Sequence, residues 1–141
     1  MTTTRRGSCL CGALRYEIDG EFDGVWMCHC SNCRKASGGT GNTILVVERA
    51  RFRWLSGEDH RTTYTLRPTY SITRCKTCGT PLPAEEDETH IYLTVGTLDD
   101  SLGVGIKNHI FHGSRPDWHA DVDGVGYFDE RPGSGSASGS A

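Results

Sequence analysis

The cysteines are the residues of this chain whose type and spacing point most directly to chemistry. Seven of them occur in 141 residues, in three tight clusters: Cys9-Leu-Cys11, Cys28-His-Cys30-Ser-Asn-Cys33 and Cys75-Lys-Thr-Cys78. Cysteines two or three residues apart bring their sulfurs to one point, which is typical of a tetrahedral zinc site rather than of a disulfide framework. The odd number also leaves one thiol over in any all-disulfide scheme. A division into four and three predicts one closed metal site and one site with an open position.

Two of the clusters are pairs that suit a closed site. Cys75 and Cys78, followed by Gly79, predict a knuckle in which both sulfurs lie on one side of a tight turn. Cys9 and Cys11 lie two residues apart, so on an extended segment their side chains point the same way. Each pair therefore supplies two sulfurs to one side of a metal ion.

The middle cluster predicts a tripod of sulfurs. Cys28 and Cys30 share one face of an extended segment, and Cys33 follows from the next turn. His29 lies between two of these ligands, so we expect its side chain to point away from the metal.

Spacing alone leaves two alternatives open. Pairing Cys30-x-x-Cys33 with Cys75-x-x-Cys78 would give a plain zinc ribbon, with Cys9, Cys11 and Cys28 left over. All the cysteines can also serve only to hold zinc for stability. The residues favour metal binding and do not decide whether a metal is catalytic.

Composition predicts a small, mainly β protein. A hydrophobic content of 35% with 18 glycines suits a turn-rich chain whose weak core is reinforced by metal. A formal net charge of −3 gives no global basic field, so we do not expect nucleic acid as a partner. The chain shows neither a secretory signal nor a membrane span, which predicts a cytoplasmic protein with reduced, metal-binding cysteines. Self-association is left open.

The elements expected around the cysteines are short. Alternating or β-branched runs predict strands at 13–18, 24–27, 43–47, 51–55, 62–66, 70–74, 90–95 and 106–111. Ser31 as N-cap predicts a helical turn over 32–36 that Gly38 ends, and Thr97 predicts another through Leu102. We expect one domain over residues 1–132 and a flexible Gly/Ser/Ala tail over 133–141.

Three motifs carry a resemblance to a known family. They are Gly7-Ser-Cys-Leu-Cys-Gly-Ala-Leu-Arg-Tyr16, Cys28-His-Cys-Ser-Asn-Cys-Arg-Lys-Ala-Ser37 and Cys75-Lys-Thr-Cys-Gly-Thr-Pro-Leu82. They resemble the glutathione-dependent formaldehyde-activating enzymes, a family that includes the zinc-binding domain of centromere protein V. The segment from His109 to Trp118 is similar to the closing segment of that family.

The resemblance implies a fold and a division of the cysteines. The fold would be an Mss4-like β-tent stabilised by zinc, with two zinc ions per chain. A structural zinc would take four ligands, and a second zinc, proposed as catalytic, would take three. The two sets are Cys9, Cys11, Cys75 and Cys78, and Cys28, Cys30 and Cys33.

The resemblance also implies a carbon–sulfur lyase-type reaction. Glutathione and formaldehyde, a small-molecule thiol and an aldehyde, would combine as S-hydroxymethylglutathione. A free thiol has a pKa of about 8.5, and an open Cys₃ zinc can lower it. Three thiolates make zinc a weak Lewis acid, so we favour thiol activation over polarisation of the aldehyde. The alternative from another class is a non-catalytic zinc module that binds protein or nucleic acid.

Such a reaction needs a proton acceptor. Histidine titrates near neutral pH, which makes His29, His109 and His112 the candidates. His29 is favoured by its place inside the tripod, although each histidine can equally be an ordinary surface or hydrogen-bonded side chain.

Glutathione also carries two carboxylates that need cationic partners. Arg34, Lys35 and Arg115 are the candidate anchors through charge-assisted hydrogen bonds. The basic run 49–53 is expected on a solvated strand face, and Trp54 and Trp118 are expected in core or rim packing.

Overall fold

The computed structural model describes residues 3–120 and 123–133 and confirms a mainly β protein. Its strands are β1 Thr4–Ser8, β2 Arg15–Asp19, β3 Val25–Cys28, β4 Asn42–Glu48, β5 Phe52–Ser56, β6 Arg61–Arg67, β7 Tyr70–Cys75, β8 Ala84–Glu85, β9 His90–Thr94 and β10 Ile106–Ile110. Its helices are α1 Ser31–Ser37 and the 3₁₀ turns η1 Arg49–Arg51, η2 Val95–Thr97 and η3 His112–Ser114. The tent arrangement stays a prediction.

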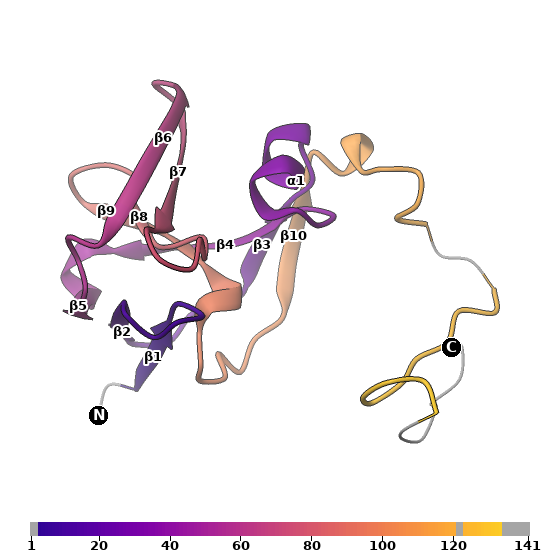
Figure 1. The fold of residues 1–141 in the computed structure, drawn as a ribbon, viewed down its shortest axis with the longest axis horizontal. Coiled ribbons are helices and arrows are strands. Elements are labelled where there is room, and N and C mark those ends of the chain that lie inside the picture. The colour runs from indigo at the N-terminus through magenta and orange to yellow at the C-terminus, as the bar shows by residue number, and fades with distance from the viewer. Residues whose placement is uncertain (1–2, 121–122, 134–141) are drawn as a thin grey trace.

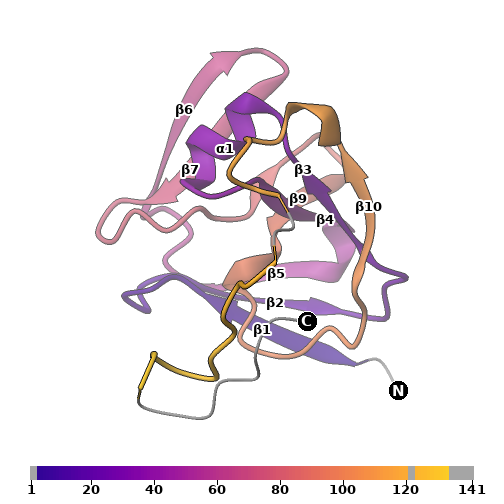
Figure 2. The same ribbon diagram turned by 90° about the vertical axis from the view of Figure 1, so that its right-hand side faces the viewer.

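The strands form three sheets of different size. Antiparallel β1, β2 and β5 make one, the order β10-β3-β4-β9-β8 makes a second, and the hairpin of β6 and β7 makes a third. Figure 1 shows the hairpin rising from the body on the same side as α1, and Figure 2 shows the two close together. Parallel pairing of β10 with β3 sets Ile110 beside Cys28, so a late segment lies against the middle cysteine cluster.

The core lies between the first two sheets. Tyr16 and Ile18 of β2 face inward by strand alternation and pack with Val47 and Leu93, all four fully buried. Each such side chain contributes roughly 1.5–3 kcal/mol through burial. The Tyr16 hydroxyl lies 2.6 Å from that of Thr97, which satisfies both groups in the interior.

Strand β1 was not predicted. It carries Arg5, whose buried guanidinium donates to the carbonyls of Gly20, Ser101 and Leu102. Gly7 of the same strand lies over the Tyr16 ring, where a Cβ would collide with that ring. The segment of β1 contains charged residues and a glycine, and it is held as a strand by contacts with residues far away in the sequence.

Two local predictions were wrong. In place of the helical turn expected from Thr97 to Leu102, a 3₁₀ turn lies at Val95–Thr97, and the hydroxyl of its last residue, Thr97, donates to the Thr94 carbonyl. The basic run was expected to alternate along a strand, but Arg49–Arg51 forms the turn η1. Arg53 pairs with Glu17 and Asp19 of β2, whereas Arg49 and Arg51 donate to backbone carbonyls.

Beyond β10 the chain packs little. The described residues 123–133 are exposed throughout, and the predicted tail, apart from Gly133, lies outside the described residues. Among the described residues, no helix has the length and apolar character that crossing a membrane requires.

Candidate metal centres and the adjoining cavity

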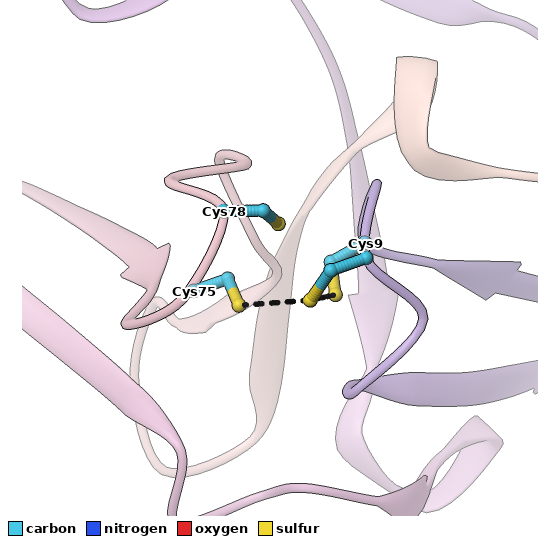
Figure 3. A group of neighbouring side chains, drawn as sticks. Cys9, Cys75 and Cys78 are labelled. Atoms are coloured by element: carbon cyan, nitrogen blue, oxygen red, sulfur yellow. Dashed lines mark hydrogen bonds between the residues drawn. The ribbon is translucent and has the colours of Figure 1, made fainter.

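Four cysteine sulfurs from two distant segments lie together. Cys9 and Cys11 come from the loop after β1, and Cys75 and Cys78 from the end of β7, with all four sulfurs within 4.8 Å of one another. Figure 3 shows the side chains of Cys75 and Cys78 from one segment and of Cys9 from the other turned into the space between the two segments. We call these residues the four-sulfur group.

The spacing of these sulfurs suits a tetrahedral ion. The sulfur of Cys11 lies 3.5 Å from that of Cys9 and 3.8 Å from that of Cys75. Metal–sulfur bonds of about 2.3 Å at tetrahedral angles separate neighbouring sulfurs by about 3.8 Å. The donor set therefore fits a tetrahedral metal ion in its number of sulfurs and in these two separations.

Hydrogen bonds to sulfur hold the group in place. The backbone N–H groups of Leu14 and Thr77 donate to the sulfurs of Cys9 and Cys75, both at 3.4 Å. The Thr80 hydroxyl lies 3.1 Å from the sulfur of Cys78, and its hydrogen bonds lower the pKa of that thiol to about 5. These donors stabilise thiolates, which are the form that binds metal.

The knuckle turn forms as the sequence predicts. Gly79 has a φ of 76°, in the left-handed region that favours glycine, and its N–H donates to the Cys75 carbonyl at 3.0 Å. Buried Leu14 and Leu82 pack around Cys9 and Cys75, and half-buried Trp54 covers them. The predicted packing role of Trp54 is confirmed, whereas Trp118 is 65% exposed.

The remaining three cysteines form a second group within one short segment. Cys28 ends β3, Cys30 precedes α1 and Cys33 lies in its first turn, with their sulfurs within 4.8 Å of one another. Among the described residues, no other Cys, His, Asp or Glu joins this three-sulfur group. It therefore offers three sulfur donors and an open position.

A cysteine, and not Ser31, caps helix α1. Cys30 keeps an extended backbone, and its sulfur accepts from the Cys33 N–H at 3.3 Å. Gly38 ends the helix in the left-handed conformation, as predicted. The helix cap is thus part of the sulfur tripod, because the hydrogen bond that caps the helix joins two of the three cysteines.

His29 points away from the sulfurs, as its extended backbone predicted. Its buried ring has Nε2 at 2.8 Å from Nδ1 of His109 on β10. The rings of His112 and His119 lie 5.3 and 5.6 Å from it, centre to centre. Burial, with the nearby His109 and His112, lowers the pKa of His29, so it is neutral at pH 7. His119 was not foreseen, because nothing in its local sequence marks it.

A cavity of about 280 Å³ opens beside the three-sulfur group. It lies between α1, the hairpin and β9, and the side chains with polar or reactive atoms in its wall include Cys33, Tyr70, Arg74, Glu85, Glu86 and Tyr92. Sequence reasoning missed this wall, because its members come from separate elements and share no spacing.

Tyr70 links the cavity to the sulfur tripod. Its hydroxyl donates to the Cys33 sulfur at 3.6 Å. Burial raises the pKa of the Cys33 thiol to about 12, and this hydrogen bond acts in the opposite direction. Burial also raises the pKa of Tyr92, so its phenol in the same wall keeps its proton at neutral pH.

The predicted carboxylate anchors lie elsewhere. Arg34, Lys35 and Arg115 are absent from the cavity wall. Arg34 and Lys35 lie on α1, with Lys35 exposed, and Arg115 places a guanidinium nitrogen 3.0 Å from the His112 ring. Their role as anchors stays a prediction that the geometry does not favour.

A small mainly β fold that carries a four-sulfur and a three-sulfur group defines a class of cysteine-rich proteins with two groups that could each hold a metal ion. Within that class, the chain belongs to the glutathione-dependent formaldehyde-activating enzyme family, whose model matches residues 4–114. The resemblance seen in the sequence is thereby confirmed.

A solved structure supports the fold. A crystal structure of a Rhodobacter sphaeroides protein superimposes with a TM-score of 0.56 at 23% sequence identity. The match covers 72% of this chain and 98% of that one. At this identity the likeness concerns the fold alone.

Proposed function

We propose that this protein is a zinc-dependent carbon–sulfur lyase-type enzyme that forms or breaks an adduct between a thiol and an aldehyde. Glutathione and formaldehyde are the proposed pair, in line with the family. The observation that carries the proposal is a group of three sulfurs, one short of a closed tetrahedral site, with one of its members, Cys33, in the wall of a cavity.

The two groups would hold zinc in different ways. The four-sulfur group would hold a structural zinc with all positions filled, and the three-sulfur group a second zinc with one position free. When bound there, the metal supplies a Lewis acid that lowers the pKa of a substrate thiol.

The reaction is an addition to a carbonyl. The thiol sulfur attacks the aldehyde carbon, a carbon–sulfur bond forms, and the electron pair of the carbonyl π bond moves to oxygen. That oxygen takes up one proton while the thiol gives one up. The Tyr92 phenol, half-buried in the cavity wall, is placed to donate a hydrogen bond to the developing oxyanion.

The charges of the wall match only part of glutathione. The wall includes two carboxylates, Glu85 and Glu86, and one guanidinium, Arg74, and Glu85 is already paired with Arg61. Arg74 already donates to the carbonyls of Gly79 and Ala36. Glutathione carries one ammonium group, at its γ-glutamyl end, and the acidic end of the wall would receive it, which leaves Arg74 for a carboxylate.

His29 remains the predicted proton acceptor, with His109 as its hydrogen-bonded partner. Neither ring lines the cavity, so this role is the least supported part of the proposal. His29→Asn tests it: loss of turnover with an unchanged metal content would support the role, and full activity would exclude it.

Proton NMR exchange tests the function directly. Formaldehyde and glutathione exchange with their adduct spontaneously, and we expect the zinc-loaded protein to speed the exchange while Cys30→Ser leaves the uncatalysed rate. If the wild-type protein carries two zinc ions and gives no acceleration, the proposed substrates are wrong.

A further inference from the structure

We infer that Tyr70 is a positioning residue for the second metal centre. Its hydroxyl holds the Cys33 sulfur in place as a metal ligand at the cavity wall. The inference rests on the proposed function, because it takes the three-sulfur group to bind a metal ion. It goes further by assigning a ligand-tuning role to a residue 37 positions away from Cys33.

The contact lies at a defined place in the site. Tyr70 Oη is 3.6 Å from Cys33 Sγ, and both residues line the same cavity. Cys33 itself is 4% exposed, so little water competes for its sulfur. A phenol has one proton to donate, and a buried thiolate is a strong acceptor for it.

The hydroxyl is held on a rigid element. Tyr70 begins β7 and pairs with Arg67 of β6, whose guanidinium also lies over the Tyr70 ring at 5.7 Å. Further along β7, Arg74 donates to the Ala36 carbonyl and ties the strand to α1. The hairpin and the helix that carries Cys33 are thus joined by a second contact besides the one between Tyr70 and Cys33.

The chemistry gives the contact a direction. A hydrogen bond from an outer group orients a metal ligand and tunes the charge that the ligand gives to the metal. A metal-bound sulfur that accepts a hydrogen bond from a phenol gives less charge to the metal. Tyr70 therefore fixes the direction of one ligand and offsets the weak Lewis acidity that three thiolates impose.

Cadmium tests the inference without turnover. We expect protein loaded with ¹¹³Cd to give two NMR resonances, one for each sulfur group, because the ligand sets differ. Tyr70→Phe removes only the hydroxyl, so it should shift the resonance of the three-sulfur site and leave the other unchanged. In a chelator titration, the same variant should weaken the second metal by about 10-fold.

Tyr64→Phe is the matched control. Tyr64 lies on β6 of the same hairpin, is 62% exposed, and should leave both resonances and both affinities unchanged. If Tyr70→Phe leaves both resonances in place and both affinities unaltered, the inference is overturned and the proposed function still stands. Shifts of both resonances would mark Tyr70 as merely structural and overturn it as well. A wild-type protein that binds a single cadmium ion would remove the second site, and the proposed function with it.

Discussion

The two sulfur groups use the same residue type and differ in what they connect. The four-sulfur group joins the loop after β1 to the end of β7, and Cys75 lies 64 positions after Cys11. The three-sulfur group comes entirely from residues 28–33 and borders a cavity. Closing a long loop adds stability to the whole fold, whereas a local tripod organises only its own turn. In the proposed function, the number of donors and the distance they span would therefore separate a structural role from a reactive one.

The largest effect expected from this contrast is on folding. Cys75→Ser should give an unfolded or insoluble protein. Structural zinc contributes an apparent binding free energy of about 10–16 kcal/mol, comparable to the whole stability of a small domain, roughly 5–15 kcal/mol. Far-UV circular dichroism and urea unfolding measure the effect.

Cys30→Ser is the matched control, because it removes a ligand of the three-sulfur group. We expect a folded protein with one zinc per chain and no catalysis. If both variants unfold to the same extent, the three-sulfur group is structural too and the contrast between the groups is lost.

The next effect concerns the order in which metal leaves. Elemental analysis should give two zinc ions per chain, and a chelator should remove the ion with the open position first. Activity would then disappear while the circular dichroism spectrum remains. Simultaneous loss of both ions would show that the two centres are not independent.

The short spacing of the cysteines made the sulfur groups predictable from the sequence. Their surroundings were not predictable, because these come from residues far away in the sequence. The ligands within each cluster are at most five residues apart, so the local backbone sets their directions. The Tyr70–Cys33 contact joins β7 to α1, and β1 depends on bonds from Arg5 to carbonyls nearly 100 residues away. The positive charges of Arg34 and Lys35 suggested anchors for a substrate, yet neither residue lines the cavity. A charge in the sequence does not show which side of α1 the cavity lies on.

Side chains packed beside the four-sulfur group should contribute more to stability than side chains that line the cavity beside the three-sulfur group. Leu14 is fully buried beside Cys9, and Leu14→Ala should lower the free energy of unfolding by about 2–5 kcal/mol. Ile72 lines the cavity and is partly exposed, so Ile72→Ala should cost less and act mainly on thiol affinity. Urea unfolding with a thiol titration separates these outcomes. Equal costs would mean that the cavity wall is as tightly packed as the structural site.

The smallest effect on stability is expected from the ion pair between Asp19 and Arg53, in the sheet of β1, β2 and β5 beside the four-sulfur group. Arg53 pairs with Asp19 at 2.6 Å, and this bond, with one from Thr4, lowers the pKa of Asp19 to about 2. The carboxylate is more acidic in the folded protein than in the unfolded chain, whose reference value is 3.8. Its contribution to stability is therefore present above pH 3.8 and disappears as the pH falls through about 2.

Asp19→Asn should lower the urea midpoint slightly, by an amount that stays constant between pH 7 and 5 and shrinks below pH 4. Asp23, paired with Lys107 beside the sheet that carries the three-sulfur group, is the counterpart. Its carboxylate side chain is 83% exposed against 25% for Asp19, so Asp23→Asn should change the midpoint less. A larger effect from Asp23→Asn would contradict this expectation. The sheet beside the three-sulfur group would then depend more on its ion pair than the sheet beside the four-sulfur group does.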